Sequence, residues 1–147
     1  YTPQLIVNGK HVVSAESPKK LLKVISDASA APALPVAVDA ALVGGRLVVN
    51  TGGGSGEANL ILAIFDESET VKVERGENGG KQLTYHNAVT GLRTIGMWKG
   101  KALEVELPRK EYLTEKGQGC AVLLQRITQQ GTPGEIIGAA VVSGTGS

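Results

Sequence analysis

The stretch YTPQLIVNGKHVV, residues Tyr1–Val13, decides how the first part of the chain folds. Two apolar β segments, 4–7 and 10–13, flank the dipeptide Asn8-Gly9. Asn and Gly both tolerate the positive φ that a type I′ turn requires, so this pair is a strong signal for a two-residue hairpin. The stretch therefore predicts two short antiparallel strands joined by a tight turn.

A helix is predicted directly after this hairpin. Ser17 suits the N-cap, and Pro18 suits the first helical position, where its missing N–H costs nothing. Apolar residues then recur at helical spacing at Leu21, Leu22, Ile25 and Ala28. Residues 1–31 thus have the order Thr-Pro, strand, turn, strand, helix, which is the order of the C-terminal half of a thioredoxin fold entered at its cis-proline.

The chain changes character after the Ala- and Pro-rich stretch 28–35, where Pro32 and Pro35 resist continuation of the helix. Short segments with period-two alternation follow, separated by turn signals about every ten residues. They predict an antiparallel β-sandwich of immunoglobulin-like appearance over residues 36–143, with a short surface helix within 108–115. The run 60–65 is apolar on both faces, as a strand covered on both faces would be. The expected core includes Leu62, Ile64, Val105, Leu123 and Val141.

Composition limits the classes of function. The 147 residues carry a formal net charge of +1, which provides no electrostatic footprint for nucleic acid or an anionic membrane. No apolar run approaches the roughly 18 residues of a spanning helix. A single cysteine, Cys120, excludes an internal disulfide framework. We therefore expect neither a nucleic-acid partner nor a membrane span.

The glycine-rich stretch 51–56 could suggest a phosphate-binding loop. Such loops need a Lys-Ser/Thr ending, or a strand-to-helix context in which backbone amides meet the anion. Here the next segment is another apolar strand, so a flexible loop between two strands is the favoured interpretation.

The densest polar chemistry lies between residues 75 and 87. Arg75, Glu77 and Asn78 form a loop with neighbouring glycines, and His86 follows on the next predicted strand. Glu77 could hold His86 in one tautomer, and His86 could then act near neutral pH. A structural role for these polar groups is favoured, and a ligand-contacting loop made of Arg75, Glu77, Asn78 and His86 stays as the alternative.

No metal site or cofactor is expected. His11, His86 and Cys120 are not spaced as ligands of one ion. Cys120 leads an apolar strand, where a small buried hydrophobe is favoured over a nucleophile. No residue of this chain is expected to be catalytic.

Three groups of residues carry a family resemblance. They are Tyr1-Thr2-Pro3-Gln4, then Arg75-Gly76-Glu77-Asn78 with Leu83-Thr84-Tyr85-His86-Asn87, and finally Gly119-Cys120-Ala121-Val122-Leu123-Leu124. In this order and at these separations they resemble the secreted, bacterial, thioredoxin-like family catalogued as domain of unknown function 1223. The resemblance covers nearly the whole chain and is weakest at 52–56 and after residue 138.

The resemblance implies a mainly β chain with an α/β fragment. Residues 1–34 would be the C-terminal part of a thioredoxin-like domain, and residues 35–147 an immunoglobulin-like β-sandwich. Members of the family resemble thiol-disulfide oxidoreductases, with a Cys-x-x-Cys pair in the half that precedes the Thr-Pro, and that half is absent from this chain. By resemblance, Thr2 and Pro3 would contact an extended substrate, since a cis X–Pro bond exposes the preceding backbone for β-type pairing.

Two functions follow as expectations. In the first, the chain is part of an extracytoplasmic (periplasmic or secreted) protein related to thiol-disulfide redox, whose partners are the missing N-terminal thioredoxin half and protein thiol substrates. In the second, it is a non-catalytic binding or structural β-sandwich module. A Cys-x-x-Cys pair in the polypeptide before Tyr1 would favour the first, while this chain alone would not be an enzyme.

Overall fold

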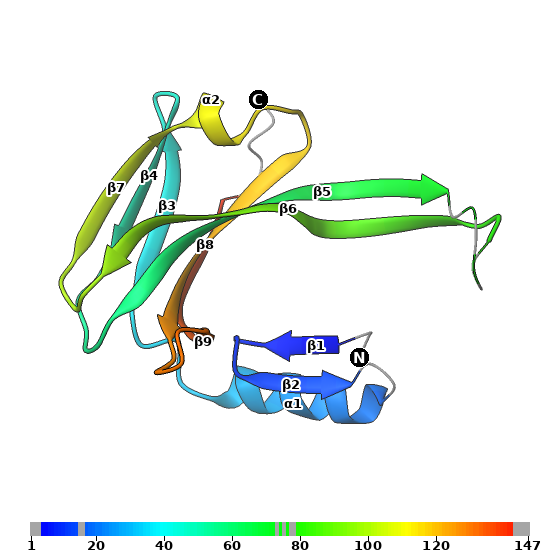
Figure 1. The fold of residues 1–147 in the computed structure, drawn as a ribbon, viewed down its shortest axis with the longest axis horizontal. Coiled ribbons are helices and arrows are strands. Elements are labelled where there is room, and N and C mark those ends of the chain that lie inside the picture. Colours follow the sequence, from blue (N-terminus) through cyan, green and yellow to red (C-terminus); the bar gives the residue numbers. More distant parts are fainter. Residues whose placement is uncertain (1–3, 15–16, 73, 75, 77–78, 143–147) are drawn as a thin grey trace.

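The structure is a computed structural model that describes residues 4–14, 17–72, 74, 76 and 79–142. Over these residues the chain forms nine strands and two helices (Figure 1). In chain order they are β1 (Gln4–Val7), β2 (His11–Ser14), α1 (Pro18–Ala30), β3 (Val38–Val43), β4 (Arg46–Thr51), β5 (Ala58–Lys72), β6 (Gln82–Trp98), β7 (Leu103–Pro108), α2 (Arg109–Tyr112), β8 (Gln118–Ile127) and β9 (Pro133–Val142).

The strands form three antiparallel sheets. β1 and β2 form a two-stranded sheet, β3, β4 and β7 a three-stranded sheet in that order, and β6, β5, β8 and β9 a four-stranded sheet in that order. The three- and four-stranded sheets enclose a common apolar core. The mainly β, antiparallel fold class predicted from alternation is therefore confirmed.

The core lies between the inner faces of these two sheets. Its largest fully buried side chains come from β4, β5, β6, β8 and β9. They are Trp98, Leu47, Leu60, Leu62, Leu124, Ile137, Val49, Val122 and Cys120. Side chains of β3 and β7 (Val38, Ala40, Leu42, Leu103, Val105 and Leu107) close the core from the other side.

Trp98 explains the glycine-rich stretch. Its indole Nε1 donates a hydrogen bond to the Gly52 carbonyl oxygen at 2.9 Å. A Cβ at Gly54 would come within 3.2 Å of the Trp98 ring and of Val36, so this position has little room for a side chain. The stretch connects β4 to β5, as expected of an inter-strand loop, and it is packed against the core.

The predicted hairpin and helix are both present. Asn8 and Gly9 have φ values of 53° and 70°, and β1 and β2 pair in register from Gln4 opposite Ser14 to Val7 opposite His11. α1 begins at Pro18 after the N-cap Ser17. The order strand, turn, strand, helix is thus confirmed, with the second strand beginning at His11, one residue later than predicted.

The core prediction is wrong for two residues. Leu62 and Ile64 are buried and Val105 packs against the core, but Leu123 is only half-buried and Val141 is 67% exposed. Their neighbours on the same strands, Val122, Leu124 and Val142, point inward instead. Since both faces of β8 and β9 are apolar, no polar residue marks which face of these strands is solvated, and alternation assigned the wrong one.

β5 and β6 are longer than the separate short strands expected in this region. β8 leaves β5 at the pair Asp66–Gln118, and beyond it β5 and β6 continue alone as a two-stranded ribbon of residues 67–72 and 82–87. We call this ribbon the arm. Figure 1 shows it extending well past the sandwich. The β5–β6 pairing has register shifts between Leu60 and Ile61 and between Ile64 and Phe65, and the second of these lies just before the arm begins.

Candidate functional site

The β1–β2–α1 unit is attached to the sandwich at one end. The backbone N–H of Ile136 donates to the carbonyl oxygen of Asn8 at 3.0 Å, and Lys10 Nζ lies 3.5 Å from Glu135 Oε2. Gly9 approaches so closely that a Cβ there would lie 2.8 Å from the Gly134 carbonyl oxygen. The hairpin turn is therefore seated on the start of β9, and the rest of the unit projects from this junction (Figure 1).

The unit leaves much of its apolar surface exposed. Val13 is its only buried residue within the described part of the unit, and strand alternation places Ile6 and Val12 on the opposite face of the hairpin. These two side chains are exposed, as are three more: Leu5, Leu22 and Ile25. Within the described residues β1 pairs only with β2, so its other edge presents unpaired backbone groups.

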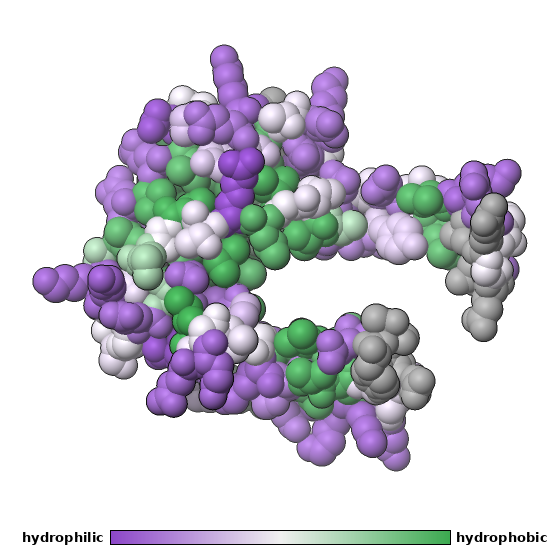
Figure 2. All heavy atoms as spheres, viewed as in Figure 1, coloured by the Kyte–Doolittle hydropathy of each residue, from purple (hydrophilic) through white to green (hydrophobic). Residues whose placement is uncertain are grey.

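A hollow separates the unit from the arm (Figure 2). β1 lies between β2 and the arm, so the open edge of β1 borders this hollow (Figure 1).

The four-stranded sheet has a second apolar face, turned away from the core. We call it the outer face. Paired residues form apolar rows across it, and the clearest row crosses all four strands. This row is Leu92, Ala63, Ala121 and Val141. Beside it lie Ile61, Leu123 and Ala139, with Thr94 as their polar partner on β6, and then Val89 and Phe65. The outer face therefore has the composition of a surface that is normally covered.

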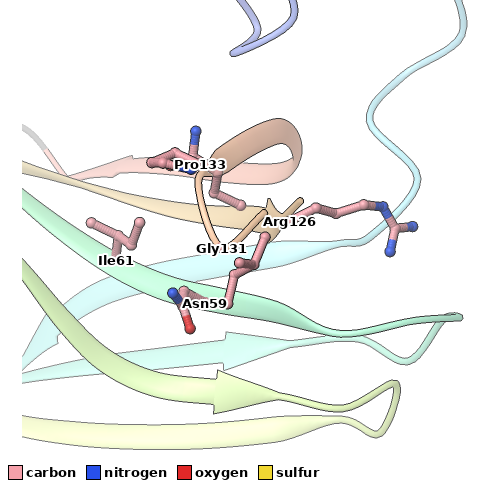
Figure 3. Close-up of a pocket in the computed structure, with 7 residues that line it drawn as sticks. Asn59, Ile61, Arg126, Gly131 and Pro133 are labelled. Atoms are coloured by element: carbon pink, nitrogen blue, oxygen red, sulfur yellow. The ribbon is translucent and has the colours of Figure 1, made fainter. Parts of the chain in front are cut away.

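A small pocket of about 100 Å³ lies at the end of the outer face (Figure 3). It is lined by Asn59, Ile61, Gln125, Arg126, Ile127, Gly131 and Pro133. Figure 3 shows Ile61 and Pro133 on the side of the sheet where the β1–β2 turn lies, and Arg126 extending away from the pocket. Arg126 Nη1 instead donates to the Ser55 carbonyl oxygen at 3.1 Å. The lining contains no carboxylate, histidine or thiol, so it offers no acid–base or nucleophilic chemistry.

Most of the predicted ligand loop lies outside the described residues, so this loop stays a prediction. Arg75, Glu77 and Asn78 lie outside the described residues. His86 is paired with Ser68 on the arm, and its side chain is exposed. The neighbouring residue Tyr85 pairs with Glu69 and, by alternation, faces the other side.

The two substrate-contacting residues implied by the family resemblance, Thr2 and Pro3, also lie outside the described residues. The strand that follows them, β1, has the exposed edge described above. Their predicted role therefore stays a prediction.

Cys120 is a core residue. It is fully buried between the sheets, and desolvation by burial raises the pKa of its thiol. A raised pKa keeps the sulfur protonated at neutral pH, so it is a poor nucleophile. His86, exposed on the arm, forms no pair with this buried thiol, and no group of three His, Cys, Asp or Glu side chains in the described part of the chain is placed to hold a metal ion.

Sequence reasoning missed the outer face, although one signal pointed to it. The run 60–65 is apolar on both faces, and on its outer side Ala63 and Phe65 are already buried by their neighbours. The outermost members of the rows, Leu92 and Val141, remain 65% and 67% exposed.

No helix in the described part of the chain is both long and apolar enough to cross a bilayer.

Comparison with known proteins identifies a family and a similar solved structure. The profile of the family described as "Protein of unknown function (DUF1223)" matches residues 1–125. The X-ray crystal structure of protein AGR_C_4864 from Agrobacterium tumefaciens is similar over the whole chain, with 30% sequence identity and a TM-score of 0.79. The chain spans only 64% of the length of that protein. No curated protein matches the chain.

Proposed function

The chain belongs to the DUF1223 family of proteins of unknown function, and from this starting point we propose that it is the C-terminal part of an extracytoplasmic thioredoxin-like protein that exchanges thiols and disulfides. In this proposal residues 1–34 complete the thioredoxin-like domain, and residues 35–147 form an appended immunoglobulin-like sandwich. The chain supplies substrate contacts and a scaffold, and the redox pair comes from the preceding half.

One observation carries the proposal: the β1–β2–α1 unit has a helix on one side, an open strand edge, and exposed apolar side chains on its other surfaces. A two-stranded hairpin buries too little surface to be stable alone in water. Further strands beside β1 and a helix over Ile6 and Val12 would complete an α/β sheet of thioredoxin type. The order of elements in this unit is the one that the end of a thioredoxin fold requires.

The chemistry assigned to the parent protein needs two thiols. A thiolate of the Cys-x-x-Cys pair would attack one sulfur of a substrate disulfide and release the other as a thiolate. The second cysteine would then attack the mixed disulfide, so the substrate is reduced by two electrons and the pair is oxidised to its own disulfide. Cys120 is the single cysteine of this chain and is buried, so it takes no part in either step.

A second candidate function is a non-catalytic binding module. The apolar outer face favours it, because exposed apolar surfaces of this kind normally mark interaction sites. In this case the thioredoxin-like unit would be structural, and the parent protein would lack a working cysteine pair.

Turnover of a disulfide substrate separates the two functions. The full-length protein and the 147-residue chain are each incubated with insulin and dithiothreitol, and the reduction of insulin is followed by turbidity. We expect catalysis by the full-length protein only. Pro3→Ala should lower its rate at least about tenfold, equivalent to about 1.4 kcal/mol of barrier, and the exposed linker variant Pro32→Ala should leave it unchanged. If the full-length protein is folded but does not reduce insulin, the redox function is excluded and the non-catalytic binding module is the function that stays.

A further inference from the structure

The outer face of the four-stranded sheet is an unusual surface for a sheet that ends at solvent. An antiparallel sheet with one solvated face normally alternates apolar and polar residues along each strand. Here the row Leu92, Ala63, Ala121 and Val141 is apolar from one edge of the sheet to the other. The two edge residues of the row are about two-thirds exposed.

The arm adds to this surface. Alternation along β5 places Val71 on the same side as Ala63 and Phe65, and Val71 pairs with Leu83. Tyr85 lies on this side too, opposite Glu69, whereas the other side of the arm carries the Thr70–Thr84 hydroxyl contact at 3.0 Å, with Ser68 and His86. The arm is therefore amphipathic, and its less polar side continues the outer face. The same side also carries Glu67 and Glu69, so it is mixed rather than wholly apolar. A ribbon of only two strands is marginally stable in water unless further structure packs against it.

The shape of the hollow restricts what can cover these surfaces. An occupant that covers the open edge of β1 must present a strand to it, because backbone groups that lose contact with water there need protein partners. It must also present apolar side chains to the outer face and to Ile6 and Val12. An α/β segment can do all of these at once, since its strands extend the β1–β2 sheet and its helices pack on flat apolar faces.

We propose that the outer face and the arm are an intramolecular interface for the α/β segment that precedes residue 1 in the full-length protein, so that the sandwich clamps the thioredoxin-like domain rather than trailing from it. The proposal rests on the proposed function for the existence of that segment. The solved relative leaves room for such a segment, because about a third of its length lies outside the match to this chain. In this proposal the occupant lies in the hollow between the hairpin unit and the arm (Figures 1 and 2).

The test uses matched charge substitutions in the full-length protein. Leu92 on the outer face is 65% exposed in this chain, and Val43 on the three-stranded sheet is 59% exposed. Leu92→Glu should lower the melting temperature of the full-length protein by at least about 4 °C, because it buries an unpaired carboxylate in the interface. Val43→Glu should leave it unchanged. In the 147-residue chain, where both positions are solvated, the two variants should behave alike.

Hydrogen exchange supplies a readout that does not depend on the variant folding. Amides of β1 and of residues 82–87 should exchange at least about tenfold more slowly in the full-length protein than in the 147-residue chain. Equal exchange in both, or equal melting of the two full-length variants, would overturn the proposal. So would a homodimer, detected by sedimentation, that Leu92→Glu dissociates, because a second copy would then occupy the face. Insulin reduction measured on the same samples tests the redox function separately. Its absence would exclude the redox function without contradicting the proposed interface.

Discussion

The sandwich and the β1–β2–α1 unit use the same kinds of residues with opposite results. In the sandwich, Leu47, Leu60 and Leu124 are at most 2% exposed, because two sheets close over them. In the unit, Leu22 is 67% exposed and Ile6 is 57% exposed, although their positions on helix and strand are equally regular. Regular secondary structure therefore does not indicate burial in this chain. We expect the free energy of local opening to differ strongly between the sandwich and the unit.

The comparison also separates two ways of holding an element in place. The strands of the sandwich are held by pairing within their sheets and by a shared core. Among the described residues, the turn of the unit contacts the sandwich through one backbone hydrogen bond, one exposed ion pair and the close approach of Gly9. Local opening should therefore begin in the unit, at a free energy well below that of global unfolding.

The largest effect is expected from truncating a core leucine. Leu124→Ala should cost about 2–5 kcal/mol of unfolding free energy, since it removes a fully buried side chain from between two sheets. Leu22→Ala on the exposed helix face should change it by less than about 0.5 kcal/mol in the 147-residue chain. Urea titration of both variants measures the difference. Equal losses would mean that the helix face is covered in solution.

The next effect concerns the junction between the two regions. Gly9→Ala places a side chain at φ 70° and within 2.8 Å of the Gly134 carbonyl oxygen. Gly44→Ala is a matched control, because Gly44 has φ 56° and no atom within 4 Å would obstruct a methyl group there. Each of these two substitutions should cost about 1–2 kcal/mol of folding free energy, because a residue with a Cβ is strained in the left-handed conformation.

Hydrogen exchange distinguishes these two glycine variants by location. Gly9→Ala should also detach the turn from β9, so protection should fall in β1 and β2 while β5 and β8 keep theirs. Gly44→Ala should leave the protection of β1 and β2 unchanged. Loss of protection across the whole sandwich in Gly9→Ala would contradict a unit that opens independently.

The order and approximate bounds of the hairpin and helix could be predicted because their signals are local. Asn8-Gly9 has the positive φ values of the turn, and Pro18 stands at the start of the helix after Ser17, whose side chain forms no capping hydrogen bond. The fold class could also be predicted from alternation and turn spacing. The orientation of β8 and β9 could not, because Val122 and Leu123 are equally apolar and only the packing of the second sheet chooses between them.

The candidate site was harder to predict than the fold. The arm depends on β5 and β6 continuing past the end of β8, which is a property of pairing between distant segments and leaves no local pattern. The outer face was signalled only by the apolar run 60–65, which indicates a covered strand without identifying its cover. Thr2, Pro3, Arg75, Glu77 and Asn78 stay predictions, since the described residues do not include them.

A smaller effect should appear at alkaline pH. Burial raises the pKa of the Cys120 thiol in the folded state, so the unfolded state ionises first. The stabilisation that this provides is complete below the unfolded pKa of about 8.5 and is lost as the pH rises through the folded value. Wild type should therefore lose more stability than Cys120→Ala between about pH 8 and pH 10. Urea titrations at several pH values give the unfolding free energy of both proteins. If this free energy fell equally with pH in wild type and Cys120→Ala, the thiol would be solvated.

The same burial predicts the reactivity of the thiol. Native protein should react slowly with a thiol reagent, at a rate limited by opening of the sandwich, and the reaction should become fast in denaturant. Gly9→Ala should leave this rate unchanged, because Cys120 belongs to the sandwich core and not to the hairpin unit. Rapid stoichiometric labelling of the folded chain would contradict the buried position and restore Cys120 as a candidate nucleophile.

The smallest effect is expected at the ion pair that bridges the two regions. Lys10 and Glu135 are 3.5 Å apart, and their side chains are 60% and 42% exposed. Exposed pairs of this kind contribute about 0–1 kcal/mol and are screened by salt. Glu135→Gln should therefore change the protection of β1 and β2 far less than Gly9→Ala does, and salt at about 1 M should remove what difference remains. A loss of protection as large as that in Gly9→Ala would show that charge, and not the backbone contact of the turn with β9, holds the hairpin unit on the sandwich.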